Sequence, residues 1–379
     1  MPPEISLIVL PNGSGDTARL PQYLLERQGA WCDLSNRTDP VAVKMIQDKL
    51  NTDLGHLQRT LELHRDEPDA ASVWNQVRVM LRNTIGNWAY SNLVPDDLRK
   101  ALKDAVDAAS QGAPPSIPVL RIHQHNHVEW IPWEIMHDGT DFLGLRFQIV
   151  RVPISATGPA PAPAQHHTVR KVANLLGREV LETQALFDEW EKTFAGFASP
   201  PPEKRLPVAN QDTSDWPDNA ILTTWLEDAP VDGARILHIT CHGNASAWTL
   251  HAEAEDPWNY EINSDTVKFM VPRDAAANLL VFCNACQSTG AGQTHTDLSL
   301  ASQCFELGVP IFIGTTARIT GRLAVPFARK FYQCLLVDGL PAGQALIATK
   351  RHFRDLGGGD PSWLFYCLYG SPNVRFQLA

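Results

Sequence analysis

The sequence predicts an α/β fold in which a mostly parallel central sheet is flanked by helices, with an α-rich N-terminal extension before it. Three observations support this prediction. Short apolar runs typical of buried strands alternate with helical patterns in the second half of the chain. Apolar residues recur every three or four positions over much of residues 1–112, as in amphipathic helices. Proline-rich stretches separate these parts.

The first part of the chain begins with one expected strand. The apolar run Ile5–Leu10 precedes Pro11-Asn12-Gly13, a typical turn sequence. The sequence Gln111-Gly112-Ala113-Pro114-Pro115 interrupts the helical pattern that follows, and we place the first domain boundary there. Three helical stripes lie between these points, formed by Leu50, Leu54, Leu57 and Leu61, by Val77, Leu81, Ile85 and Trp88, and by Leu98, Leu102 and Val106.

Beyond residue 112, the sequence predicts a group of strands, then two proline-rich segments, and finally strands that alternate with helices. Residues 156–165 have the composition of a linker, and residues 199–220 are polar, proline-rich and expected to be irregular. The predicted domains are 1–112, 113–198, 199–220 and 221–379. Strands are expected at 119–122, 128–131, within 132–153, 235–240, 279–283 and 309–314. Helices are expected at 221–226, over a segment that contains Leu298, Ala301 and Phe305 and stops at Gly308, and over a segment that contains Phe327, Phe331 and Leu335.

Composition excludes several classes of function. A net charge of -10 and the lack of a dense basic cluster argue against a nucleic-acid partner. No apolar run approaches the roughly 18 residues of a membrane helix, and the N-terminus does not resemble a signal peptide. Seven cysteines without a framework spacing predict free thiols in a reducing compartment. We therefore expect a soluble cytoplasmic protein that needs no cofactor and no metal.

Reactive side chains follow two of the predicted strands. ILHITCHGNA (236–245) ends its strand at His242 and Gly243, and LLVFCNAC (279–286) ends at Cys286. In open α/β sheets, functional groups gather beyond the carboxyl ends of the strands. An imidazole there can accept the thiol proton, and the thiolate is then the nucleophile. Gly243 lacks a side chain, so its backbone N–H can approach a developing oxyanion.

Other interpretations of these residues remain open from the sequence. Cys283 and Cys286 have the spacing of a redox or zinc pair, although Cys283 lies in an apolar strand and no second pair completes a zinc site. His123, His125 and His127 alternate along one strand and could share a metal, but no acidic or Cys partner is near them in sequence and an exposed hairpin explains them better. Cys241 is interpreted as a packing residue.

Several segments, in order, resemble one family. HITCHG, NACQSTGAG, LSLASQCFELGVPIFIGT, FARKFYQCLLVDGLPAGQAL and DPSWLFYCLYGSP resemble the CHAT-domain caspase-like cysteine proteases, of the clan of caspases, separases and gingipains. IPWEIMHDGTDFLGLRFQIVRVP resembles the N-terminal half of that domain, which lacks catalytic residues. The resemblance covers roughly residues 115–379. It implies a caspase-like sandwich whose inactive half is 113–198 and whose catalytic half is 221–379.

The resemblance implies roles for particular residues. His242 would be the base and Cys286 the nucleophile, with the N–H groups of Gly243 and Cys286 as oxyanion donors, while His238 lies inside the strand and is not catalytic. Asn284, Thr316 and Arg318 would contact substrate. Asn284 stands where relatives that cut after Arg or Lys often carry a carboxylate, and residues 315–322 lack the Trp and Asp common in the family.

The predicted function is that of a cysteine endopeptidase, and the resemblance implies that it cleaves a specific partner protein in bacterial antiviral defence or programmed cell death. An activating protease or regulatory protein is a further expected partner, because 199–220 is a candidate site of activating cleavage. The alternative is a catalytically silent CHAT scaffold that binds a partner through residues 1–112.

Overall fold

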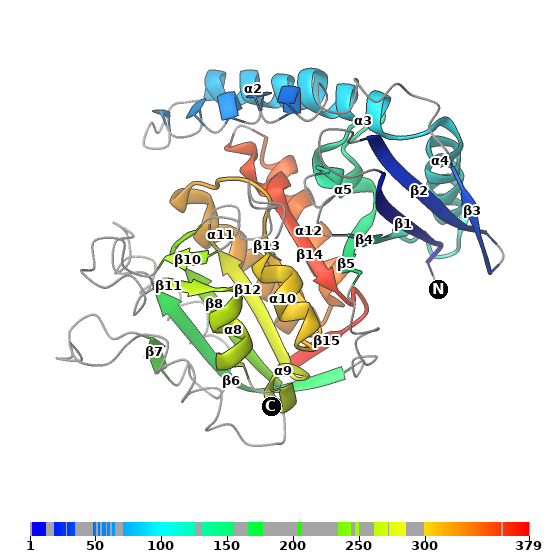
Figure 1. Ribbon diagram of the computed structural model, residues 1–379. Coiled ribbons are helices and arrows are strands. Elements are labelled where there is room, and N and C mark those ends of the chain that lie inside the picture. The colour runs from blue at the N-terminus through cyan, green and yellow to red at the C-terminus, as the bar shows by residue number, and fades with distance from the viewer. Residues whose placement is uncertain are drawn as a thin grey trace. The chain divides into compact units, whose positions relative to one another are not determined.

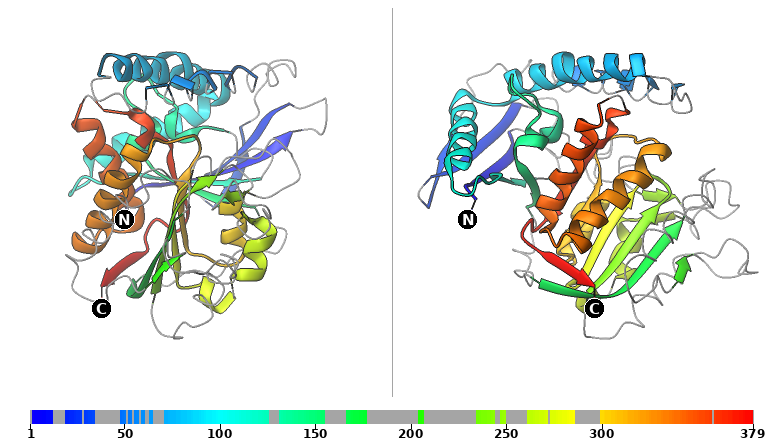
Figure 2. Two further views of the ribbon diagram at one scale, coloured as in Figure 1. Left: turned by 90° about the vertical axis from the view of Figure 1, so that its left-hand side faces the viewer. Right: turned by 180° about the vertical axis from the view of Figure 1, so that it is seen from behind.

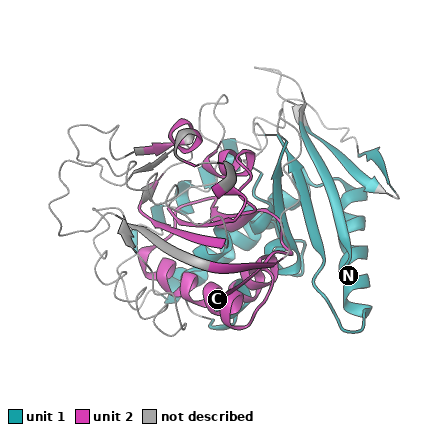
Figure 3. Ribbon diagram, turned by 90° about the horizontal axis from the view of Figure 1, so that it is seen from below, with its two compact units in different colours: residues 1–154, 350–365 teal, residues 155–349, 366–379 magenta. Residues whose placement is uncertain are grey.

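The fold is described from a computed structural model of the chain, which forms two compact units (Figure 3). Unit 1 comprises residues 1–154 and 350–365, and unit 2 comprises residues 155–349 and 366–379. Unit 1 joins the N-terminal region to residues beyond 113, and the predicted domain boundaries stay a prediction. The structure describes residues 2–12, 19–27, 29–34, 48–50, 52–53, 55–57, 59–60, 63–64, 71–125, 131–154, 166–176, 204–206, 234–243, 247–249, 261–271, 273–285, 299–357 and 359–378.

Unit 1 contains a mixed sheet with strand order β5-β4-β1-β2-β3. β1 pairs in parallel with β4, and β4 pairs in parallel with β5, whereas β2 and β3 add antiparallel. The α-rich N-terminal region thus contributes three strands, of which only the first was predicted. The strands are β1 (Glu4–Asn12), β2 (Arg19–Arg27), β3 (Ala30–Asp33), β4 (Val119–Gln124) and β5 (Gln148–Pro153).

The helices of unit 1 largely follow the predicted stripes. Val77, Leu81 and Ile85 are buried as predicted, but Trp88 is half-buried and Ala89 is buried instead. The π-turns of η2 explain this difference, because an extra residue in a turn shifts the buried face by one position. The elements are α2 (Ala71–Met80), η2 (Leu81–Gly86), α3 (Asn87–Leu93), α4 (Asp96–Gln111), η4 (Trp133–Ile135), α5 (Leu143–Arg146) and η7 (Pro361–Phe365).

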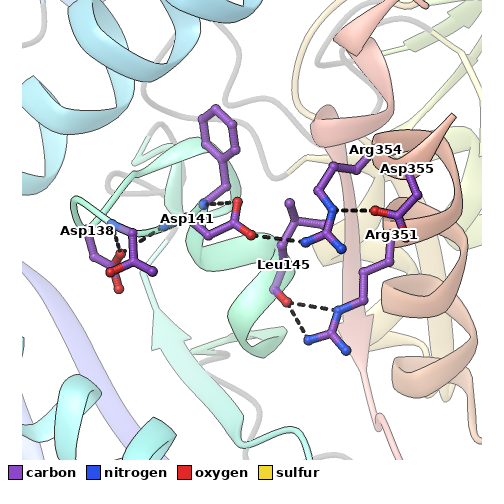
Figure 4. A network of polar contacts seen from close by, with 8 residues as sticks. Asp138, Asp141, Leu145, Arg351, Arg354 and Asp355 are labelled. Carbon is purple, nitrogen blue, oxygen red and sulfur yellow. Dashed lines mark hydrogen bonds and ion pairs between the residues drawn. The ribbon is translucent and has the colours of Figure 1, made fainter. Parts of the chain in front are cut away.

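Segment 132–153 is mostly not the strand that the sequence predicted. Only β5 is a strand; η4, an isolated bridge and α5 precede it. Residues 128–130 of the predicted strand 128–131 lie outside the described residues. Helix α12 (Ala342–Asp355) begins in unit 2 and ends in unit 1, where its last turn contacts this segment. Arg351 donates to the backbone oxygen of Leu145 at 2.8 Å, and Arg354 binds Asp141 at 3.1 Å (Figure 4).

Unit 2 contains a sheet with strand order β15-β6-β8-β12-β13-β14, and β7 pairs with β6. The pairs are parallel except that β13 and β14 are antiparallel. The strands predicted at 235–240, 279–283 and 309–314 are present, and the parallel α/β fold is confirmed. The strands are β6 (His166–Leu176), β7 (Lys204–Leu206), β8 (Ala234–Thr240), β12 (Leu279–Asn284), β13 (Ile311–Thr315), β14 (Tyr366–Gly370) and β15 (Arg375–Leu378).

The prediction that 199–220 is wholly irregular was wrong at Lys204–Leu206. These three residues form β7 and pair in parallel with Ala173–Leu175 of β6. Backbone pairing with a neighbouring strand satisfies amide groups that a short polar run would otherwise leave to water. The remaining residues of 199–220, and the predicted helix at 221–226, lie outside the described residues.

Helices cover both faces of the unit 2 sheet (Figures 1 and 2). α8 and α10 pack against one face, where Val281, Cys283 and Phe312 belong to a large apolar cluster. α11 and η6 pack against the other face, where Phe282 contacts Phe331 at 5.1 Å between ring centroids. The helices are α8 (Ser264–Met270), α9 (Arg273–Ala276), α10 (Leu300–Glu306), α11 (Gly321–Tyr332) and η6 (Gln333–Val337), and a small sheet contains β9 (His242–Gly243), β10 (Ala247–Thr249) and β11 (Glu261–Asn263).

Two predicted helical features of unit 2 are confirmed. Phe327, Phe331 and Leu335 are all fully buried on α11 and η6. α10 ends before Gly308, whose φ of +96° favours glycine.

Within the described part of the chain, no helix is long and apolar enough to cross a membrane.

Candidate active site

Two neighbouring parallel strands, β8 and β12, end at the same edge of the unit 2 sheet. Thr240 at the end of β8 pairs with Asn284 at the end of β12. His242 follows Thr240 by two residues; its backbone belongs to β9 and pairs with Thr249. Cys286 follows Asn284 by two residues and lies outside the described residues. In the sequence, the two predicted catalytic residues thus stand at equivalent positions after two strands that pair.

The side chain of Asn284 lies in a buried polar network. Its Nδ2 donates to the backbone oxygen of Ala324 in α11 at 3.2 Å and lies 3.3 Å from Nε2 of His238. Its Oδ1 accepts a hydrogen bond of 2.6 Å from the hydroxyl of Tyr366 in β14. Because a backbone carbonyl can only accept, the Ala324 contact fixes which end of the amide is nitrogen. Asn284 therefore ties β12 to β8, α11 and β14.

The same contacts determine the protonation of His238. Its Nε2 faces the amide donor of Asn284 and, at 3.1 Å, the hydroxyl of Thr240, so this nitrogen carries the lone pair. The proton is then on Nδ1, which donates to the hydroxyl of Tyr332 at 3.0 Å. The ring stacks on Phe282 with centroids 5.2 Å apart. Burial lowers the pKa of His238 to about 3, so the ring is neutral.

A second polar contact holds the chain beyond β12. The hydroxyl of Thr315, the last residue of β13, donates to the backbone oxygen of Ala285 at 2.8 Å. Both residues are fully buried. Ala285 directly precedes Cys286 in the sequence, so this bond fixes the last described peptide oxygen before the predicted nucleophile.

The predicted substrate-binding residues have different surroundings. Asn284 is only 5% exposed and its amide is hydrogen-bonded within the protein. Thr316 is half-buried and Arg318 is exposed, both on the segment that connects β13 to α11. α11 in turn contacts Asn284 through Ala324, so the segment begins and ends close to the end of β12. The role of these residues in substrate binding stays a prediction.

Gly243 lies in the small sheet beside the predicted base. It is half-buried, and its backbone belongs to β9, where it pairs with Trp248 of β10. Its role as an oxyanion donor stays a prediction.

The competing interpretations of the cysteines and histidines can be compared with the structure. Cys241 and Cys283 both belong to the apolar cluster beneath α8 and α10, as predicted for packing residues. The rings of His123 and Trp31 pack edge to face, with their centroids 6.4 Å apart. His127 lies outside the described residues, and among those described no group of three or more His, Cys, Asp or Glu is arranged to hold a metal.

Comparison with known structures indicates the fold. The chain is similar to separase in two crystal structures of the Saccharomyces cerevisiae separase–securin complex, with TM-scores of 0.54 and 0.52 and identities of 12% and 10%. The matches cover 99% and 98% of this chain but 30% of the separase chain. A structure of the pro- and mature domains of Porphyromonas gingivalis RgpB has a TM-score of 0.45 at 10% identity, covering 82% of this chain and 78% of that one. The fold is that of the caspase-like cysteine proteases.

The family follows from the sequence match. Residues 84–362 match the CHAT domain, and the chain belongs to this family. No curated protein matches the chain.

Proposed function

We propose that this chain is a cysteine endopeptidase in which His242 and Cys286 form the catalytic dyad. One observation carries the proposal: β8 and β12 are adjacent parallel strands with Thr240 paired to Asn284, and the two catalytic candidates each follow by two residues. Strands that end in register bring the residues after them to one edge, where α/β proteins build their sites. The caspase-like fold supports the same reaction class.

The other histidine of the motif is unsuited to act as the base. His238 is buried, both of its nitrogens are hydrogen-bonded, and its pKa of about 3 leaves it a weak proton acceptor. A base is effective when its pKa lies near the working pH. This supports the assignment of the base to His242.

The proposed reaction proceeds in two stages. His242 takes the proton of the Cys286 thiol, and the thiolate attacks the carbonyl carbon of the scissile peptide bond. The N–H groups of Gly243 and Cys286 stabilise the oxyanion, and His242 returns the proton to the leaving amine as the C–N bond breaks. His242 then takes a proton from water as the oxygen attacks the thioester, and Cys286 leaves as the thiolate.

We propose a protein as the substrate, in bacterial defence or programmed cell death. The separase structures that this chain resembles contain a protein partner, securin, which supports a protein-binding surface in this fold. We further propose that cutting within 199–220 activates the chain, at a position outside β7, because residues in a paired strand resist proteases. If uncut protein, verified by intact mass, is already fully active, this activation is ruled out.

The experiment that tests the dyad compares three single variants. Cys286→Ala and His242→Ala should each reduce hydrolysis of a fluorogenic peptide library by about 1,000-fold or more. Cys283→Ala should keep most of the activity, because Cys283 packs in the apolar cluster. Robust cleavage by Cys286→Ala would contradict the proposal, as would equal loss in a stable Cys283→Ala protein. No hydrolysis by the wild type, with no His242-dependent labelling of Cys286 by a thiol-reactive peptide, would favour the silent scaffold.

A further inference from the structure

Thr315 extends the connection between β12 and β13 beyond the point where their backbones pair. The strands pair in parallel from Leu280 with Ile311 to Phe282 with Ile313. Two residues further along β13, the hydroxyl of Thr315 donates to the oxygen of Ala285 at 2.8 Å. A side chain thus holds the chain where the ladder has ended.

This hydrogen bond acts on a peptide group that carries more than its carbonyl. The oxygen of Ala285 belongs to the same peptide unit as the N–H of Cys286. A trans peptide is planar, with its C=O and N–H pointing in opposite directions. A donor that fixes the direction of the carbonyl therefore fixes the direction of the N–H as well, and a hydrogen bond to the oxygen polarises the N–H as a donor.

We propose that Thr315 is a positioning residue that aims the backbone N–H of Cys286 at the oxyanion of the peptide carbonyl under attack. The inference rests on the proposed peptidase function, in which that N–H is an oxyanion donor. Such donors are effective because they are already aligned before charge develops. The burial of Thr315 and Ala285 keeps water from competing for the bond.

The structure provides a matched control for a merely stabilising role. Thr349 in α12 is also fully buried, and its hydroxyl also donates to a backbone oxygen, that of Ala345, at 2.8 Å. Thr315→Val and Thr349→Val each remove one buried hydroxyl and leave one carbonyl without that donor. A general loss of stability should therefore appear in both variants, whereas a catalytic loss should appear only in Thr315→Val.

The test measures hydrolysis and alkylation on the same proteins. Alkylation of Cys286 by iodoacetamide needs the thiolate but forms no oxyanion, so it separates the nucleophile from its oxyanion donors. For the library peptide that the wild type cleaves fastest, Thr315→Val should lower kcat about 10-fold, less than the roughly 100-fold or more expected for complete loss of a donor. KM and the alkylation rate should stay within about twofold, because only oxyanion stabilisation is lost. Thr315→Ser should recover most of kcat, and Thr349→Val should retain it.

A third readout does not depend on peptidase activity. In protein labelled with 15N-cysteine, the amide signal of Cys286, assigned by its loss in Cys286→Ser, should shift in Thr315→Val and stay in place in Thr349→Val. If the wild type hydrolyses no peptide, the peptidase proposal fails, and this signal alone decides whether Thr315 orients the amide. The inference would be overturned if Thr315→Val left the amide signal of Cys286 or kcat unchanged. It would also be overturned if Thr315→Val slowed alkylation as much as hydrolysis, or if Thr349→Val lost as much kcat as Thr315→Val.

Discussion

The buried His238 makes the stability of the protein sensitive to acid. In the folded state burial lowers the pKa of His238 to about 3, against an ordinary value of 6.5. Between these two values the unfolded chain binds a proton that the folded chain does not, so the free energy of unfolding falls as pH falls. The full effect is about 5 kcal/mol, at about 1.4 kcal/mol per pH unit, lost progressively from about pH 6.5 down to about pH 3.

The structure explains why His238 resists protonation. A second ring proton on Nε2 would face the amide nitrogen of Asn284, which is itself a donor held by the oxygen of Ala324, and the hydroxyl of Thr240 would have to turn to accept it. On Nδ1 the proton is already in use toward Tyr332. Protonation would therefore break the contact with Asn284 as well as place a charge in the interior.

The assay is urea unfolding of the wild type and His238→Gln at several pH values. Carboxylates titrate in both proteins, so the difference between them isolates His238. Between pH 6 and pH 4.5 the wild type should lose about 2 kcal/mol more than the variant. Parallel losses in the two proteins would refute the reasoning. If His238→Gln does not fold, the ring signals of His238 in the wild type serve instead, and they should not titrate above about pH 4.5.

Two further predictions concern unit 1 and substrate choice. Arg151→Met should destabilise the protein by about 3–5 kcal/mol in urea unfolding at pH 7, because it leaves Glu134 buried without its partner at 2.5 Å. The ion pair with Arg151 now lowers the pKa of Glu134, and without Arg151 burial would raise it. The loss of stability in Arg151→Met should therefore shrink toward pH 5, where Glu134 becomes protonated in the folded variant. Adding Glu134→Gln to the Arg151→Met protein should recover part of the lost stability. A deficit independent of pH would contradict this cause. Cleavage of a peptide library should not be restricted to Arg or Lys before the cut, because Asn284 is neutral and Arg318 is exposed nearby in sequence; a purely basic profile would contradict it.

The sequence predicted those parts of the fold whose signal is local. β8 and β12 are continuous apolar runs, and the stripe of Phe327, Phe331 and Leu335 has a clear helical period. β2 and β6 gave no such signal, because β2 contains Pro21 and β6 contains two adjacent basic residues. β2 forms because it pairs with β1, which in turn pairs with β4 more than 100 positions later. Pairing between strands so far apart in the sequence forms only when the sheet assembles, so no local sequence pattern predicts it.

The candidate site shows the same division. The sequence indicates His242 and Cys286 because each lies two residues after an apolar strand and belongs to a short motif, and their catalytic roles stay a prediction. Thr315 and Tyr366 were missed, because their contacts depend on the register of three strands. A weak signal was present: the apolar strand β14 contains the tyrosines Tyr366 and Tyr369, and a buried tyrosine hydroxyl needs a partner.

A group of buried polar side chains lies at the end of β12, where Asn284 meets His238 and Tyr366. On the face toward α11, Leu280 and Phe282 are apolar, and only Asn284, at the end of the strand, is polar. Backbone pairing with β13 ends at Phe282 while pairing with β8 continues to Asn284, and beyond Phe282 the hydrogen bond from Tyr366 to Asn284 links β12 to β14. Phe282 stacks on His238 and helps to exclude water, and this exclusion strengthens the hydrogen bonds that His238 and Asn284 make. The same exclusion of water makes His238 costly to protonate, so the expected acid sensitivity and the buried hydrogen bonds of Asn284 arise from one arrangement.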